Sequence, residues 1–147
     1  MSRMIFVNLP VADLPRAKAF YEAIGFTNNP QFTDDTAACM VLTDAIYVML
    51  LTHEKFAQFT TREIADANRT AQMLLALSCD SREGVDEITE AAIATGGVEA
   101  HDPEDLGFMY SRGFWDPDGH GWGPFHMDMA GFEAAQQAEP VPEPTNA

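Results

Sequence analysis

The chain has 147 residues, 46% of them hydrophobic, which suits one domain or two half-domains that share a core. Its 23 acidic and 8 basic residues give a net charge of −15, which argues against nucleic acid and anionic membranes as partners, because phosphate binding needs clustered Lys and Arg. No apolar run approaches the roughly 18 residues that span a bilayer, and no cleavable leader is visible, so we expect a cytoplasmic protein. Cys39 and Cys79 lie in apolar stretches without metal or disulfide spacing, and we expect both thiols to be reduced.

The first half of the chain predicts the element order β-α-β-β-β. Residues 4–11 form an apolar run of strand length, and Asp13 then caps a helix that has Pro15 in its first turn and ends at Gly25. Residues 26–35 predict a strand broken by a turn. Two apolar runs joined around Thr43 and Asp44 predict a hairpin.

The same order restarts after a polar connector at 53–72. A strand over 73–80 precedes a helix that begins at Ser81 and ends at Gly96 and Gly97, and three strand candidates follow between 98 and 128. The repeat predicts an internal duplication: a first module at 1–52, the connector at 53–72, a second module at 73–129, and a disordered tail at 130–147, together one domain.

The segment WDPDGHGWGPFHMD contains a strong turn signal before the final strand. Proline presets φ, and Gly119 supplies a positive φ at little cost. Gly121, Gly123 and Pro124 all weaken β structure, so this strand is unusual for its place in the repeat.

The stretch VNLPVADLPRAKAFYEAIGF resembles the opening signature of the vicinal oxygen chelate superfamily, the glyoxalase, bleomycin-resistance and extradiol-dioxygenase group. The matching residues are Val11, Asp13, Leu14, Phe20, Tyr21, Gly25 and Phe26, and the late Asp-Pro-Asp-Gly is the corresponding signature of the second half. The stretches NPQFTDDTAACMVL, LLALSCDSREGVDE and DGHGW are similar to a subgroup of predicted lactoylglutathione lyases. The resemblance implies an α+β fold of two repeated βαβββ modules forming a cupped mixed sheet, a ligand or metal in the cup, and a homodimer.

In metal-dependent members of this superfamily, His, Gln or Glu ligands lie on the first and last strands of each module. The resemblance places those positions on Phe6, Leu74, Gly123 and Val48, with Met49 beside the last. None of these side chains offers the oxygen, nitrogen or thiolate donor that a divalent cation needs. We therefore expect no cofactor, and a divalent metal only through residues outside the family positions.

Four histidines remain as candidate donors. His53 and His101 lie in polar connectors and are expected to be solvated, and His120 belongs to the turn. His126 lies in the last strand, where alternation places it on the face opposite Gly123. A bulge at Gly123 and Pro124 would turn it inward instead, and both orientations stay open.

An apolar ligand pocket is the first functional hypothesis. Aromatic and soft side chains expected inside the cup are Phe6, Tyr47 or Met49, Tyr110, Phe114 and Trp122, with Asn8 and Arg112 as polar groups and His126 as the open case. Each of these could equally be an ordinary core or surface residue. The guanidinium of Arg112 would suit a carboxylate or phosphate.

The favoured function is a glyoxalase- or bleomycin-resistance-like protein that binds a small, largely apolar or aromatic molecule without the usual metal. The alternative is a metal-dependent lyase or dioxygenase, similar to lactoylglutathione lyase, that uses displaced donors such as His126 with Glu54 or His120. A third option is a catalytically silent dimeric interaction module. No catalytic residue is assigned from the sequence.

Overall fold

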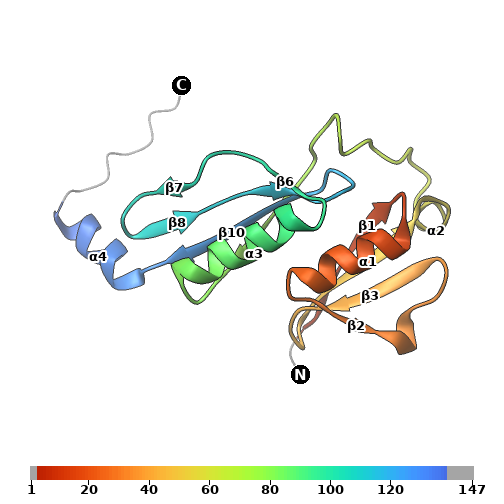
Figure 1. Cartoon of the computed structure of the whole chain (residues 1–147), viewed down its shortest axis with the longest axis horizontal. Coiled ribbons are helices and arrows are strands. Elements are labelled where there is room, and N and C mark those ends of the chain that lie inside the picture. Colours follow the sequence, from red (N-terminus) through yellow and green to blue (C-terminus); the bar gives the residue numbers. More distant parts are fainter. Residues whose placement is uncertain (1–2, 139–147) are drawn as a thin grey trace.

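The computed structural model describes residues 3–138 and consists of two βαβββ modules side by side (Figure 1). The first module contains β1 (Ile5–Val11), α1 (Leu14–Ala23), β2 (Thr27–Asn29), the short 3-10 helix η1 (Pro30–Phe32), β3 (Ala37–Val41) and β4 (Ile46–Thr52). Its strands follow the order β1-β4-β3-β2, with β1 parallel to β4 and the other pairs antiparallel. The predicted α+β class and repeated module are confirmed.

Local signals in the sequence account for helix α1. The carboxylate of Asp13 accepts a hydrogen bond from the backbone N–H of Arg16 at 3.1 Å, which caps the first turn. Leu14, Ala17, Phe20 and Tyr21 are the buried residues of this helix, and their spacing places them on one face. Gly25 follows the helix with a φ of +111°, a conformation that favours glycine and ends the helix.

The second module follows a connector that contains the short helix α2 (His53–Ala57). It comprises β5 (Leu74–Ser78), α3 (Arg82–Ala94), β6 (Val98–Glu99), β7 (Glu104–Asp105), β8 (Met109–Ser111), β9 (Phe114–Trp115) and β10 (Gly121–Met127). Strand β5 is parallel to β10 on one edge, and β8 and β9 are antiparallel to it along the other. This arrangement repeats the plan of the first sheet, with β5 in the place of β1 and β10 in the place of β4.

Strands β8 and β9 are one strand with a local interruption. Phe125 pairs with Ser111 and Trp122 pairs with Phe114, so the register against β10 is unchanged across the break. The backbone N–H of Arg112 donates to the carbonyl of Pro124 at 3.1 Å, but Pro124 has no N–H to return the bond. Strand β10 therefore runs through its glycines and its proline without the bulge that would have turned His126 inward.

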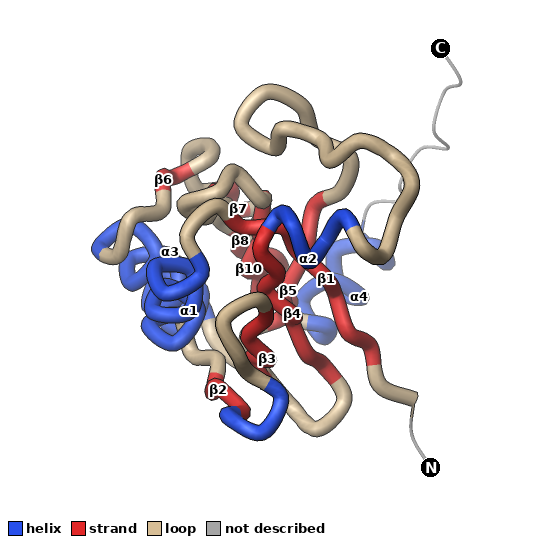
Figure 2. The backbone as a smooth tube through the Cα atoms, turned by 90° about the vertical axis from the view of Figure 1, so that its right-hand side faces the viewer, coloured by secondary structure: helices blue, strands red, loops and turns tan. Residues whose placement is uncertain are grey.

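The two modules share one hydrophobic core, which lies between the sheets and the helices α1 and α3. Figure 2 shows both helices on the same side of the strands. Phe114 and Trp122 of the second module pack with Leu9, Phe20 and Tyr21 of the first, and all five are less than 10% exposed. Both cysteines are free thiols.

The opposite side of the two sheets, away from α1 and α3, is less covered. We call it the open sheet face, and it carries Phe6, Asn8, Tyr47, Met49, Leu74, Ala76 and Gly123. Strand alternation assigns these residues, because their neighbours Val7, Leu9, Val48 and Trp122 belong to the core or pack against it. Phe6 stacks on Tyr47 with ring centroids 4.4 Å apart, and Phe6 and Leu74 are 46% and 71% exposed.

The C-terminal stretch differs from the disordered tail expected at 130–147. Residues Met129–Ala138 form helix α4. The carboxylate of Asp128 accepts a hydrogen bond from the N–H of Gly131 at 3.1 Å. The ring of Phe132 packs against that of Phe108, with ring centroids 5.1 Å apart. These contacts order the first part of the stretch, and residues 139–147 lie outside the described part. Between residues 3 and 138, no helix combines the length and apolar character needed to cross a membrane.

Candidate functional site

The Asp-Pro-Asp-Gly turn of the second module is held in shape by its own first residue. One carboxylate oxygen of Asp116 accepts hydrogen bonds from the backbone N–H groups of Asp118 and His120, at 2.9 and 2.8 Å. Gly119 has a φ of +93°, and a Cβ at this position would lie 2.7 Å from the carbonyl carbon of Ala67. The turn therefore requires glycine for its backbone angle and for the close approach of the connector.

The same turn joins the two modules through a set of hydrogen bonds. The hydroxyl of Tyr21 donates to the second oxygen of Asp116 at 2.6 Å, and the indole N–H of Trp122 donates to that hydroxyl at 3.0 Å. The backbone N–H of Ala12 donates to Oδ1 of Asp118 at 2.8 Å. Nε2 of His120 lies 2.7 Å from the carbonyl oxygen of Pro10, so this nitrogen carries the proton and donates.

Burial shifts the pKa values of the central pair. Desolvation raises the pKa of Asp116 above its usual value, although hydrogen bonds from Tyr21 and the turn, together with the nearby His120, oppose the rise. The pKa of Tyr21 is raised well above 10.0, first by burial and then by the adjacent charge of Asp116. At neutral pH the tyrosine is thus held as a neutral donor to a buried carboxylate.

A pocket of about 260 Å³ lies beside this turn, under the connector between α2 and β5. Asn8 and Pro10 of β1 contribute to its lining, together with Trp115, Phe56, Ile64 and Met73 from the second sheet and the connector. We call it the connector pocket. Its walls are mainly apolar, and Glu63 is the charged side chain among its lining residues.

A second pocket of about 190 Å³ adjoins the connector pocket and shares His120, Pro10 and Ile64 with it. We call it the Asp118 pocket, because the side chain of Asp118 lines it and is only 8% exposed. Oδ2 of Asp118 is buried and has no hydrogen-bond partner within residues 3–138. Asp66 and His53 also line this pocket.

The four positions at which the resemblance expects metal ligands lie on the open sheet face, outside both pockets, once Met49 takes the place of Val48. Leu74 pairs with Gly121 and Ala76 with Gly123, just as Phe6 pairs with Tyr47 and Asn8 with Met49. Met49 is therefore the structural counterpart of Gly123, whereas Val48 points into the core and is 1% exposed. The four side chains at these positions are those of Phe6, Met49, Leu74 and Gly123. They offer a phenyl ring, a thioether, an isobutyl group and a hydrogen, and this set does not fit a divalent cation.

The structure separates the residues predicted to share the cup. Phe6, Asn8 and Met49 do lie on the open sheet face, and of these only Asn8 lines the connector pocket. The expectation that Phe114 and Trp122 face the cup is wrong, because both are core residues under the helices. Trp122 is the neighbour of Gly123 in one strand, so the two side-chain positions cannot share a face.

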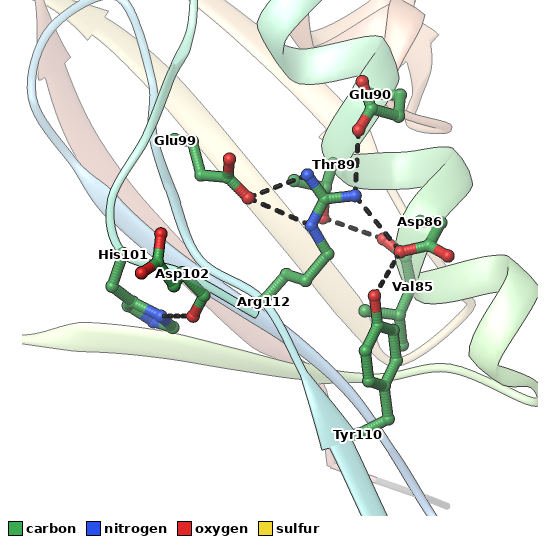
Figure 3. Close-up of polar contacts among 9 residues, drawn as sticks. All are labelled: Val85, Asp86, Thr89, Glu90, Glu99, His101, Asp102, Tyr110 and Arg112. Carbon is green, nitrogen blue, oxygen red and sulfur yellow. Dashed lines mark hydrogen bonds and ion pairs between the residues drawn. The ribbon is translucent and has the colours of Figure 1, made fainter. Parts of the chain in front are cut away.

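Tyr110 and Arg112 also point toward α3, contrary to the expectation that they face the cup (Figure 3). The guanidinium of Arg112 contacts Glu99, Glu90 and Asp86 at 2.7, 2.9 and 3.1 Å, and the hydroxyl of Tyr110 donates to Asp86 at 2.6 Å. Burial lowers the pKa of Arg112, but these carboxylates outweigh it and raise the pKa above its ordinary value. These three ion pairs join Arg112 to α3 and β6, so its guanidinium serves a structural contact instead of binding an anionic ligand.

The histidines considered as displaced metal donors are far apart. Nδ1 of His126 lies 3.0 Å from the carbonyl oxygen of Cys79, on the helix side of β10. His120 precedes the same strand, about 20 Å away at roughly 3.3 Å per residue. In the part of the chain that the structure describes, no three His, Cys, Asp or Glu side chains are grouped so as to hold a metal ion.

Sequence reasoning missed the residues that enclose the two pockets. Trp115, Ile64 and Ala67 line the connector pocket, and Asp118 lines its neighbour. The connector is polar and has only a weak helical pattern, which does not indicate that it folds back over the turn. The available signal was Gly119, because a glycine after Asp-Pro-Asp is expected both for a positive φ and for close backbone contact.

Comparison with known proteins agrees with this architecture. Residues 3–42 match the family model described as bleomycin resistance protein-like N-terminal. Among solved structures, a hypothetical protein from Staphylococcus aureus is similar with a TM-score of 0.72 and 24% identity, covering 86% of this chain and 95% of that one. No curated protein sequence matches the chain.

Two further similar structures carry descriptive names. A glyoxalase/bleomycin resistance protein/dioxygenase family enzyme from Burkholderia phytofirmans has a TM-score of 0.71 and 22% identity, covering 86% of this chain and 99% of that one. The fosfomycin resistance protein FosX from Listeria monocytogenes has a TM-score of 0.61 and 20% identity, covering 86% and 93%. The family-model match and the shared fold confirm the resemblance to the vicinal oxygen chelate superfamily, the glyoxalase, bleomycin-resistance and dioxygenase group.

Proposed function

We propose that the protein binds a small, largely apolar molecule in the connector pocket and that this binding does not use the metal positions of its superfamily. The observation that carries the proposal is the pocket itself, about 260 Å³ of mainly apolar space between the modules. Such a pocket gains affinity from buried apolar area, and a few polar groups orient the ligand. The bleomycin- and fosfomycin-resistance names of similar proteins are consistent with small-molecule binding on this fold.

The donor set supports binding without a metal. Phe6, Met49, Leu74 and Gly123 supply no hard or borderline donor at the family positions. The alternative lyase or dioxygenase with displaced donors has no supporting observation among the described residues, since His120 and His126 contact carbonyl groups at separate ends of β10.

A titration with toluene tests the proposal. We expect saturable changes in the NMR signal of the Trp115 indole N–H, because Trp115 lines the pocket. Ile64→Trp fills the pocket and should abolish these changes, whereas the matched Ile93→Trp on α3 places the same side chain at a position that is 38% exposed and should retain them. Absence of saturable binding, or equal binding in both variants, would contradict the proposal.

We also propose that two copies of the chain pair through the open sheet face. Phe6 and Leu74 are 46% and 71% exposed on the open sheet face, and exposed apolar groups of this kind favour association. Light scattering should give the mass of a dimer, and Leu74→Lys should give a monomer. Leu106→Lys, at a position 51% exposed between β7 and β8, is the matched control and should leave the dimer intact. A monomeric parent protein would refute the pairing.

A further inference from the structure

The charged groups around the connector pocket and the Asp118 pocket have one sign. Glu63 lines the first, and Asp66 and Asp118 line the second, while no Lys or Arg belongs to the described residues that line either one. Arg112, the cation that the sequence offered for an anionic ligand, is instead held by three carboxylates beneath α3. An anion entering these pockets would meet carboxylates and no Lys or Arg among the lining residues, since Arg16 belongs to neither lining and is paired with Asp118.

Asp118 combines a buried side chain with an incompletely satisfied carboxylate, although it also forms an ion pair with Arg16. Its Oδ1 accepts from the N–H of Ala12, and the nearest guanidinium, that of the half-exposed Arg16, lies 3.8 Å from the same oxygen. Its Oδ2 has no hydrogen-bond partner in residues 3–138, although the side chain is more than nine-tenths buried. A buried carboxylate oxygen without a donor is costly, and a donor or a positive charge placed beside it relieves that cost.

The two adjoining pockets differ in polarity, one being mainly apolar and the other lined by a carboxylate. The connector pocket presents apolar walls that include Trp115 and Phe56, and the Asp118 pocket presents the carboxylate. His120 lines both pockets, and its Nε2 is occupied by the carbonyl of Pro10, so the ring is fixed between them. A molecule with an apolar body and a positively charged end matches this order of groups.

Building on the proposed function, we infer that the preferred ligand is a small apolar or aromatic amine, whose ring or chain fills the connector pocket and whose ammonium group lies beside Asp118. This assigns Asp118 as a specificity-determining residue, and the assigned site does not include Phe6, Met49, Leu74 or Gly123.

Three probes that share a phenyl ring test the inference at pH 7: 2-phenylethylammonium, 2-phenylethanol and 3-phenylpropionate. The signal of the Trp115 indole N–H reports binding of each one. We expect the ammonium to bind about tenfold more tightly than the alcohol, because a buried charge about 4–6 Å away gives an attraction of that order, and we expect the carboxylate to bind most weakly.

Asp118→Asn isolates the carboxylate, since its amide oxygen can still accept from the N–H of Ala12. We expect it to lower ammonium affinity by about fivefold or more while alcohol affinity stays within about twofold, as removal of one buried charge requires. Asp44→Asn, in the exposed turn between β3 and β4, makes the same change in net charge and should alter neither affinity.

The possible outcomes separate the inference from the function on which it rests. Equal binding of all three probes, or tightest binding of the carboxylate, overturns the preference for amines but leaves the pocket as a binding site. Binding of none of the probes overturns both. If Asp118→Asn does not fold, the order of the three probes in the parent protein decides the question: an ammonium affinity no higher than that of the alcohol contradicts the inference.

Discussion

Replacing Tyr21 by Phe removes a hydroxyl that links the two modules in the core. Tyr21 is fully buried, and its hydroxyl both donates to Asp116 and accepts from Trp122. The substitution preserves the ring packing but leaves a buried carboxylate oxygen and a buried indole N–H without this partner. Each orphaned group costs about 1–3 kcal/mol, so we expect the free energy of unfolding to fall by about 2–4 kcal/mol, since deleting the hydroxyl also removes its own desolvation cost.

Urea denaturation followed by circular dichroism measures this loss. At a slope of about 2 kcal/mol per molar urea, the midpoint should fall by about 1–2 M. Tyr47→Phe is the matched control, because its hydroxyl donates to the carbonyl of Asp44 at the surface and water can replace it. We expect that control to lose less than about 1 kcal/mol.

The pKa of Asp116 is a second readout of the lost hydrogen bond, because a defect in packing alone would leave that pKa unchanged. The hydrogen bond from Tyr21 lowers the pKa of Asp116, so its loss should raise that pKa further above 3.8. The folded variant then binds a proton more readily than the folded parent, and the difference in stability between them should shrink as the pH falls through this range. A loss no larger than that of Tyr47→Phe, or an unchanged pKa of Asp116, would refute the role given to the hydroxyl.

Three further outcomes follow from the structure. Arg112→Lys should lower the free energy of unfolding by about 1–3 kcal/mol in urea, because an ammonium cannot satisfy three carboxylates in the planar geometry of a guanidinium; an unchanged midpoint would contradict this. Gly119→Ala should destabilise the protein more than Gly107→Ala in the same assay, since both have positive φ at about 1–2 kcal/mol of strain but only Gly119 has backbone within reach of a new Cβ. Carbon-detected NMR titration should place the pKa of Asp116 above 3.8, because of burial, and that of Asp86 below 3.8, because Tyr110 and then Arg112 donate to it; the reverse order would refute both environments.

The fold was predictable because its signals are local and occur twice. Asp13 and Ser81 cap the two long helices at the expected positions, and Gly25 ends the first. The repeat then fixed the order of strands, since a strand, a helix and three strands leave few ways of forming one sheet. The ladder of β10 survived two glycines and a proline because β5 on one edge and β8 with β9 on the other hold it.

The candidate site was less predictable, because alternation along a strand defines two sets of residues without saying which set faces the helices. Tyr110, Arg112, Phe114 and Trp122 form the set under α1 and α3, although the three aromatic rings among them predicted a cup lining. Placing Gly123 on the open sheet face is enough to put its strand neighbour Trp122 on the opposite face, toward the helices. The connector pocket depends on contacts between segments distant in sequence, which no local pattern encodes.

The bonds made by the Asp-Pro-Asp-Gly turn also constrain how the chain is made. Ala12 and Asp118 are 106 residues apart, and Tyr21 and Trp122 are 101 apart, so the contacts that close the shared core connect the beginning of the described chain to nearly its end. A chain emerges from the ribosome N-terminus first at about 5–20 residues per second, so Leu9, Phe20 and Tyr21 stay uncovered for about 5–20 seconds until the last strand follows. The first module therefore cannot complete its core until β10 has been made, and a nascent chain that stops before β10 leaves Phe20 and Tyr21 without their partners Phe114 and Trp122.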